Sequence, residues 1–299
     1  MAPVRVNAAL IVMLASGMLA GCQTPAFLDP TVPSSSESAF DRMSRMLSGP
    51  DTSPASQQAL GDRLAEQALT RVRLADDDAM EDYLGKLANR IAHGTKAQPF
   101  DFKVYLVDDA KPNAFTPGGG HIFVTTGLVA RLGTEGQMAM VLAHEIGHNA
   151  EAHIIKGSHR RSVGRRATVA SRTVFDEKLG LSWVGEKIGS AINATVNLYT
   201  GDQEDAADEI GLDYMVAAGY HPDESILTIE ALVRDTGSER ASALDLGWNA
   251  NKSRRLVRIK NLIVAKYRDR DFSHARRSTV DYDRLAVRYW QRARSLAAE

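Results

Sequence analysis

Two histidines separated by three residues, with a glutamate directly after the first, occur at His144, Glu145 and His148. On an α-helix, residues i and i+4 lie one turn apart on the same face, so both imidazoles can reach one zinc ion at about 2.0–2.1 Å. A carboxylate beside that ion can accept a proton from an activated water molecule and later pass it to a leaving amine. The stretch therefore predicts one zinc ion per chain and a hydrolytic role for Glu145.

The residues around this motif have the pattern of a helix. Thr134, followed three residues later by Gln137, fits a capping box, and the range 135–155 contains no proline, so we expect a helix that ends before Gly157. Hydrophobic residues that repeat every four positions are expected to be buried on a stripe apart from the histidines: Met138, Leu142 and Ile146. The same pattern also fits an ordinary core helix that carries two polar histidines.

Composition sets broad limits on the class of protein. The 299 residues are 44% hydrophobic, which is enough for a real core in one large domain or two small ones. The chain has 36 basic and 37 acidic residues and a net charge of −1. This balance gives no indication of a nucleic-acid partner or of an acidic partner, and we expect no nucleic-acid binding.

The N-terminus has the pattern of an export signal. Arg5 supplies a positive charge, and residues 8–20 form an apolar run that is too short for a good membrane span. This run ends in Leu19-Ala20-Gly21-Cys22, which resembles the bacterial lipobox, where the signal is cut before a cysteine that is then lipidated. We therefore expect a lipoprotein signal peptide over residues 1–21 and a lipid on Cys22.

Cys22 is the only cysteine in the chain, so an internal disulfide is excluded. The alternative is a plain secretory signal followed by an unrelated cysteine. Gln23 in the next position, rather than Asp, agrees by analogy with sorting to the outer membrane. The sequence therefore predicts a bacterial envelope protein that faces the periplasm, with a flexible Ser-, Pro- and Thr-rich tether over residues 22–57.

The rest of the chain is expected to form a catalytic domain over residues 58–222 and a helical extension over 223–299 packed on it. Apolar spacing predicts two scaffold helices within 58–93, and alternation predicts a strand at 102–107. Further helices are expected towards the C-terminus at 226–233, 256–267 and 268–299.

A glycine-rich turn precedes the predicted metal-binding helix. Pro117 and three glycines lead into a short strand of β-branched and aromatic residues that ends about ten residues before that helix. We expect an edge strand beside the metal, where the stretch from Gly118 to Thr125 hydrogen-bonds an extended peptide. The alternative is a hairpin edge without a ligand. Candidate substrate-binding residues are Gly119, His121, Ile122, Phe123 and Val124.

A catalytic zinc ion needs three protein ligands, so a third must come from elsewhere. Continuation of the motif to a third histidine on the same helix is excluded by Glu151 and Ile154, and His153 points in the wrong direction. A glutamate on a second helix remains. Glu204 and Asp208 share one helical face, so Glu204 could bind the ion while Asp208 accepts from a histidine. An acidic first turn that complements the helix dipole explains the same residues equally well.

A family resemblance decides between these two interpretations. The matching stretches run in order from about residue 60 to residue 222, and they include Pro-Gly-Gly-Gly-His-Ile-Phe-Val-Thr-Thr-Gly at 117–127, Ala-His-Glu-Ile-Gly-His at 143–148, Glu-x-x-Ala-Asp-x-x-Gly at 204–211 and Ala-Ala-Gly-Tyr-His-Pro at 217–222. They resemble the gluzincin metallopeptidases of the HtpX and CAAX prenyl protease family. The lipobox places the chain closest to the soluble periplasmic lipoprotein branch, which is similar to the β-barrel-assembly-enhancing proteases.

The resemblance implies zinc bound by His144, His148 and Glu204, with Glu145 as general base and acid and Asp208 as a partner of a ligand histidine. It also implies an α+β fold. We expect a mainly helical zincin-like domain with a small β-sheet whose edge strand flanks the zinc helix, plus C-terminal helices.

One position departs from the family pattern. Relatives have Ser-Arg where this chain has Thr200 and Gly201, and glycine has no side chain to do what the arginine does. Tyr199 and Tyr220 are candidates for a compensating hydrogen-bond donor. Three further segments have predicted roles. The basic stretch at 156–172 forms a solvated helical face or, alternatively, a surface for anionic lipid or substrate. An amphipathic helix is expected at 179–198 over the cleft, and in relatives the loop at 236–252 can cover the zinc ion.

These observations predict a zinc endopeptidase that hydrolyses unfolded or misassembled envelope proteins and is held at the membrane by lipid on Cys22. The outer-membrane assembly machinery is a possible partner. The alternative is a zinc-bearing, non-cutting or latent chaperone or assembly factor for outer-membrane proteins, suggested by Gly201 and the basic segment.

Overall fold

The computed structural model describes residues 50–97, 99–157, 199–233 and 252–298, all of which belong to one unit that comprises residues 48–299. Several predictions lie outside the described residues. They concern the signal peptide, Cys22, most of the tether, the basic segment beyond residue 157, the amphipathic helix at 179–198, and nearly all of the loop at 236–252.

Two N-terminal helices confirm the predicted scaffold. Helix α2 spans Pro54–Leu69 and begins inside the predicted tether, because Ser53 caps it and Pro54 suits a first helical position. Helix α3 spans Asp78–Ala92, and the side chain of Asp77 caps it by accepting from the Met80 backbone amide. Both helices bury their apolar stripes against the sheet and the core.

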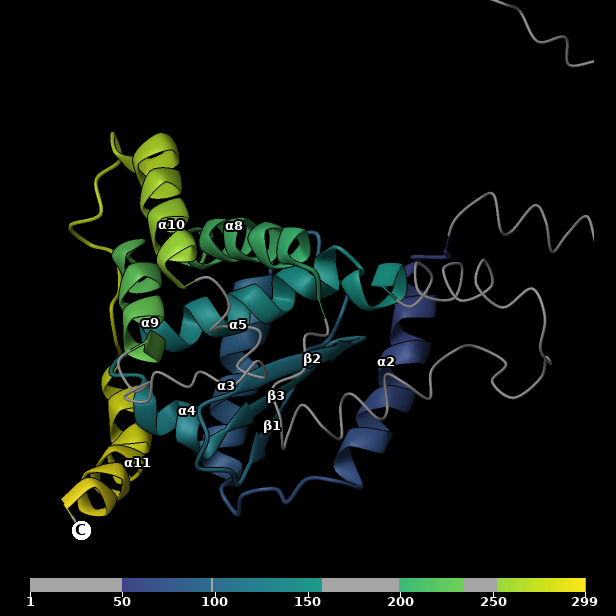
Figure 1. Ribbon diagram of the computed structural model, residues 1–299, viewed down its shortest axis with the longest axis horizontal. Coiled ribbons are helices and arrows are strands. Elements are labelled where there is room, and N and C mark those ends of the chain that lie inside the picture. Colours follow the sequence, from purple (N-terminus) through teal and green to yellow (C-terminus); the bar gives the residue numbers. More distant parts are fainter. Residues whose placement is uncertain (1–49, 98, 158–198, 234–251, 299) are drawn as a thin grey trace, which may run out of the picture. The chain divides into compact units, whose positions relative to one another are not determined.

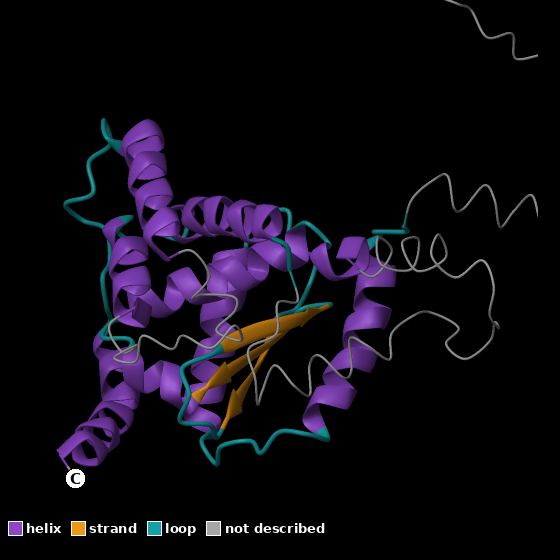
Figure 2. Ribbon diagram, in the orientation of Figure 1, coloured by secondary structure: helices purple, strands orange, loops and turns teal. Residues whose placement is uncertain are grey.

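Three short strands form one mixed sheet beside the helices (Figure 2). The strands are β1 (Lys103–Val107), β2 (Ala114–Gly118) and β3 (His121–Thr125), in the spatial order β1-β3-β2. Strand β3 pairs in parallel with β1 and antiparallel with β2. The central strand is therefore β3, which is buried along its whole length.

The predicted substrate-binding edge is wrong in its position. Because β3 pairs with a neighbour on each side, it has no free edge for a peptide to join. The candidate residues His121, Ile122, Phe123 and Val124 are buried within it, and Gly119 lies in the turn before it. The strand that packs against the motif helix is β2, an edge of the sheet, so the expected edge strand beside that helix is present but lies earlier in the chain.

The glycine-rich turn between β2 and β3 requires its glycines. Gly118, Gly119 and Gly120 have φ angles of 94°, 63° and 84°, which side chains rarely adopt. A Cβ atom on Gly119 would lie 3.0 Å from the Gln57 backbone oxygen of α2. The turn thus reverses the chain where it also passes close to α2.

The motif lies on helix α5, Glu135–Ala150, which follows the short helix α4, Thr126–Arg131. Thr134 caps α5 by accepting from the Gln137 amide, while the Gln137 side chain accepts from Gly133 rather than completing the predicted box. The helix ends at Ala150, about five residues earlier than expected, because Ala152 has a φ of 51° and turns the chain. The predicted stripe is buried, but so is nearly every other residue of α5.

Helix α5 lies between the sheet and α8, which spans Gly201–Ala217 (Figure 1). Thr200 and Gln203 form a complete capping box at the start of α8. The two helices approach closely at glycines: a Cβ atom on Gly211 would lie 2.9 Å from the His144 backbone nitrogen. Helix α8 therefore packs closely against the motif helix.

Gly211 and Gly201 provide a matched test of this packing, because both lie on α8 but a Cβ on Gly201 meets nothing within 4 Å. We expect Gly211→Ala to lower the free energy of unfolding by about 1–3 kcal/mol through overpacking. Gly201→Ala is expected to leave stability unchanged or to raise it by at most about 1 kcal/mol. Chemical denaturation of both variants measures the difference, and equal stabilities would contradict the close approach.

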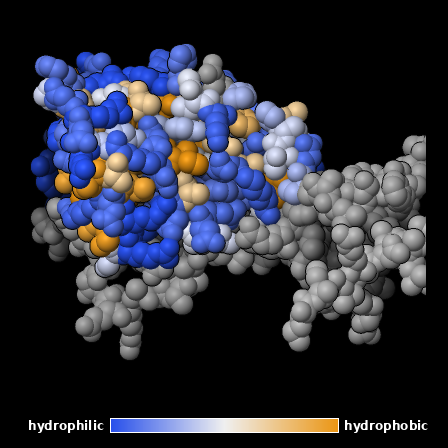
Figure 3. Space-filling model, turned by 90° about the horizontal axis from the view of Figure 1, so that it is seen from above, coloured by the Kyte–Doolittle hydropathy of each residue, from blue (hydrophilic) through white to orange (hydrophobic). Residues whose placement is uncertain are grey.

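Three C-terminal helices complete the unit. Helix α9 (Asp223–Val233) packs on α5, α10 (Lys252–Tyr267) packs on α8 and α9, and α11 (Val280–Ala298) packs on α3 and α4 (Figure 1). Among the described residues, no helix has the length and apolar character needed to cross a membrane. On the face shown in Figure 3, hydrophobic residues form several separate groups among hydrophilic ones.

Candidate metal centre

Side chains from α5 and α8 converge on one point. His144 Nε2 lies 3.1 Å from His148 Nε2 and 3.4 Å from Oε2 of Glu204 on α8. His148 Nε2 lies 3.7 Å from the other carboxylate oxygen of Glu204, Oε1. The α5 periodicity places both imidazoles on one face, and the glycine contact with α8 brings Glu204 to them. Within the described residues this is the group of histidine and acidic side chains whose spacing could hold a metal ion.

The geometry of these atoms fits a metal ion. Ligand atoms at about 2.0–2.1 Å from a tetrahedral zinc ion stand about 3.3 Å from one another, close to the observed separations. Glu204 Oε2 is buried and makes no hydrogen bond to any described residue. Two imidazoles and a carboxylate with an unsatisfied buried oxygen are a suitable ligand set for a divalent cation.

Asp208 fixes the orientation of His144. Its Oδ1 lies 3.0 Å from His144 Nδ1, so that Nε2 of the same ring faces the candidate ligands. Burial opposes ionisation of Asp208, but the charge of Arg255 and hydrogen bonds from Arg255 and His144 hold its pKa well below the ordinary value. Burial lowers the pKa of His144, whereas Asp208 and Glu204 raise it to about 9.

His148 has different partners. Its Nδ1 lies 2.8 Å from His153 Nδ1, so one of these nitrogens donates to the other. Burial, together with the charge of His144, lowers the pKa of His148 well below the ordinary value, and burial lowers that of His153 to about 4. Both rings are therefore neutral near pH 7, which is the form of imidazole that binds metal ions. Gln203 on α8 donates to the His153 backbone oxygen at 3.2 Å.

Tyr199 joins the metal centre to the edge strand. Its ring stacks on that of His148, with centroids 3.6 Å apart and planes 13° apart, and its hydroxyl donates to the Thr116 carbonyl of β2 at 2.7 Å. Burial, with the nearby carboxylates of Glu145 and Glu204, raises the pKa of Tyr199 well above the ordinary value. This hydroxyl is thus a hydrogen-bond donor at any physiological pH.

Glu145 and the end of α5 are held in a dry environment. The exposed fractions of His144, Glu145 and His148 are 2%, 3% and 2%. Asn149 donates to the Glu145 backbone oxygen and to Thr116 Oγ1, and it accepts from the Gly120 amide. The last turn of α5 is thereby attached to the β2–β3 turn.

The structure therefore brings together His144, Glu145, His148, Glu204 and Asp208, all of which were predicted to form the site. It adds His153 and Arg255 as neighbours of those side chains, and it places Tyr199, one of the two candidate donors, against His148. Tyr220 does not belong to the centre: its hydroxyl bonds to Arg90 and Glu135 instead. His121 bonds to Asp62 and Tyr105 on the far side of the turn.

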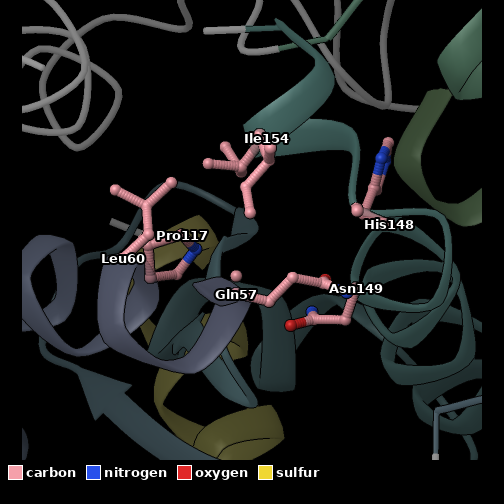
Figure 4. A pocket seen from close by; sticks show the side chains of 9 residues that line it. Gln57, Leu60, Pro117, His148, Asn149 and Ile154 are labelled. Carbon is pink, nitrogen blue, oxygen red and sulfur yellow. The ribbon is translucent and has the colours of Figure 1, made fainter. Parts of the chain in front are cut away.

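A small cavity lies beside the end of α5, and one of the candidate ligands, His148, is among the residues that line it (Figure 4). Its empty volume is about 200 Å³, including open solvent, and Gln57, Leu60, Pro117 and Ile154 lie on its walls. In Figure 4 the ring of His148 points away from Ile154 and Pro117. The cavity therefore lies between α2, the β2–β3 turn and the chain after α5, and it reaches the metal centre at His148.

Comparison with known proteins agrees with the geometry. Residues 78–262 match the model of Peptidase family M48. The chain is 23% identical over 166 residues to a protein of Vibrio cholerae named putative beta-barrel assembly-enhancing protease, which covers 54% of this chain and 34% of that relative. It is 27% identical over 248 residues to Metalloprotease LoiP of Escherichia coli, which covers 81% of this chain and 91% of that relative.

The coverage differs between these relatives. The chain spans only 34% to 46% of the length of the beta-barrel assembly-enhancing proteases that it matches in Vibrio cholerae and Escherichia coli. The family match, in contrast, extends over more than half of the chain and includes α5, α8 and most of α10. The chain belongs to Peptidase family M48.

Proposed function

We propose that this protein is a zinc-dependent endopeptidase that hydrolyses peptide bonds of unfolded or misassembled proteins of the bacterial envelope. The observation that carries this proposal is the convergence of ligand atoms of His144, His148 and Glu204 within 4.8 Å of one another, with Glu145 on the helix that carries both histidines. Family membership supports the reaction class, and the names of the relatives support envelope proteins as substrates.

The proposed division of roles follows from the positions of the side chains. His144, His148 and Glu204 hold the zinc ion, which when bound polarises the scissile carbonyl and makes water more acidic. Glu145 accepts a proton from the attacking water, whose oxygen bonds to the carbonyl carbon. The C–N bond then breaks, and the proton from Glu145 passes to the leaving nitrogen. Asp208 keeps the His144 ring oriented throughout.

We propose that the peptide lies along the outer edge of β2, which pairs with no other strand among the described residues. This strand packs against α5, and its Thr116 carbonyl already accepts from the hydroxyl of Tyr199, which stacks on His148. A peptide strand that extends past Thr116 must displace this hydrogen bond. Because the ligand histidines are only 2% exposed, binding also requires the site to open.

We further propose that the protein acts at the periplasmic side of the outer membrane, held by lipid on Cys22 after removal of residues 1–21. The lipobox carries this part of the proposal, and the named relatives agree with it. The outer-membrane assembly machinery is the proposed partner.

The burial of the ligands favours a second candidate, a latent or non-cutting assembly factor that binds zinc and clients. The experiment that separates the two uses the full chain in mild detergent with one equivalent of zinc and unfolded casein. New α-amino groups, counted with an amine-reactive dye and located by mass spectrometry, are expected to accumulate with time. Casein that is retained by the protein but stays intact would reject the peptidase and support the assembly factor.

A further inference from the structure

Arg255 of α10 is buried at the centre of the α8–α10 interface, with an exposed fraction of 3%. Its Nε donates to Asp208 Oδ2 at 2.8 Å, and its Nη2 donates to Asp208 Oδ1 at 2.5 Å. This two-point contact fixes both the position and the rotation of the carboxylate, which a single ammonium group cannot do.

The carboxylate that Arg255 holds is the one that orients a candidate ligand. Asp208 Oδ1 also lies 3.0 Å from His144 Nδ1, so the guanidinium, the carboxylate and the imidazole form one continuous chain of contacts. We propose that Arg255 is a positioning residue for the metal: it holds Asp208 so that His144 Nε2 faces the ion, and it completes the charge balance of the site. This inference rests on the proposed metal site.

The charges of the site support this role. Three carboxylates, those of Glu145, Glu204 and Asp208, lie in a nearly dry region, where the described residues supply one buried guanidinium, that of Arg255. Two negative charges remain after this pairing, and a divalent cation neutralises them. Without Arg255, the same ion would leave one buried negative charge uncompensated, which low-polarity surroundings strongly disfavour.

Two neighbouring arginines on α10, Arg254 and Arg258, also pair with acidic residues of α8 and serve as a comparison for Arg255. Arg254 pairs with Asp205 at 2.5 Å, and Arg258 pairs with Glu209 at 3.0 Å. Both pairs also connect α10 to α8, but they are more exposed than the pair of Arg255 with Asp208, and neither acidic partner is among the converging side chains. Arg254→Gln and Arg258→Gln are therefore matched controls for the docking of α10, and both are expected to bind zinc as the wild type does.

The test measures zinc affinity rather than activity alone. The full-length wild type and the Arg255→Gln, Arg254→Gln and Arg258→Gln variants are freed of metal and titrated with zinc against a chromogenic chelator, below the unfolding temperature of each. We expect Arg255→Gln to bind zinc about 10- to 100-fold more weakly, the usual effect of losing a partner that orients a ligand. Arg255→Lys keeps the positive charge but cannot make the two-point contact with Asp208, so its zinc affinity is expected to lie between those of Arg255→Gln and the wild type.

A double variant separates positioning from general destabilisation. If Arg255 acts through Asp208, the combination of Asp208→Asn with Arg255→Gln weakens zinc binding little more than the stronger single change does. The inference is overturned if Arg255→Gln binds zinc as tightly as the wild type, or if all three arginine variants lose affinity equally. If Arg255→Gln does not fold, wild-type affinity in Arg255→Lys overturns it. A wild type that binds no zinc would instead reject the proposed metal site itself.

Discussion

Replacement of Glu145 by glutamine is expected to lower kcat for casein cleavage by about 10³-fold, within the 10²- to 10⁴-fold range of general acid–base catalysis. The amide has nearly the size of the carboxylate but cannot accept the proton of the attacking water. Because Glu145 is not among the three side chains whose atoms converge, the variant is expected to bind zinc as tightly as the wild type. Initial rates of amino-group release, together with zinc titration, measure both quantities.

The control for this variant lies at the end of the same helix. Glu151 follows α5, pairs with Lys156 at the surface, and has a side chain that is 29% exposed. Glu151→Gln makes the same chemical change and is expected to keep at least half of the wild-type rate. Undiminished cleavage by Glu145→Gln would show that another group supplies the base, and it would remove the main catalytic assignment.

Replacement of Glu204 by alanine is expected to abolish high-affinity zinc binding. The change removes a proposed ligand, so the loss should exceed the roughly 100-fold that is typical for a partner outside the ligand set. Zinc at 100 times its dissociation constant stabilises a folded protein by about 2.7 kcal/mol, so the melting temperature of the wild type should rise on addition of zinc. The melting temperature of Glu204→Ala should not respond.

Glu209 provides the matched control for this second prediction, because it lies on the same helix but bonds to Arg258 and Lys266 at the surface. Glu209→Ala is expected to bind zinc normally and to show the full thermal response. If Glu204→Ala kept wild-type affinity, the two histidines would need a different third ligand, and the acidic start of α8 would be a helix-dipole feature.

The sequence predicts much of this site because its main elements are local. Two histidines four residues apart, a capping threonine and the absence of proline together predict α5 and the face that carries the imidazoles. The spacing of Glu204 and Asp208 places both on one face of α8, but spacing alone does not distinguish a ligand from a capping acid. Only the family resemblance separates those interpretations. The contact between His144 and Asp208 joins residues that are 64 positions apart, and local spacing does not predict it.

The order of the strands in the sheet could not be predicted from local sequence patterns. Strand β2 contains Pro117 and ends in glycine, so its residues do not alternate like a strand, whereas β3 has a strong strand pattern. Strand strength, however, does not determine strand order. The parallel pairing of β3 with β1 fills the second side of β3, and this pairing is a tertiary contact that periodicity does not predict.

The missed residues share the same cause. Arg255 lies in a helix with several other basic residues and reads as part of a solvated face, yet it is the one of Arg254, Arg255 and Arg258 whose side chain is buried on Asp208. His153 was expected to point away from the metal, and the positive φ of Ala152 instead turns it back against His148. At Gly201, a Cβ atom would meet nothing within 4 Å, so the backbone leaves room for a side chain at this position. Arg255 supplies a guanidinium to Asp208 from α10.

The most direct test of the proposed function is a zinc titration of casein cleavage by metal-free, full-length protein. If His144, His148 and Glu204 form one catalytic site, the rate should be negligible without metal. It should then rise in proportion to added zinc and stop rising at one equivalent per chain. Cleavage by the metal-free protein, or no cleavage once one equivalent is bound, would contradict the assignment of this centre as the catalytic site of a zinc peptidase.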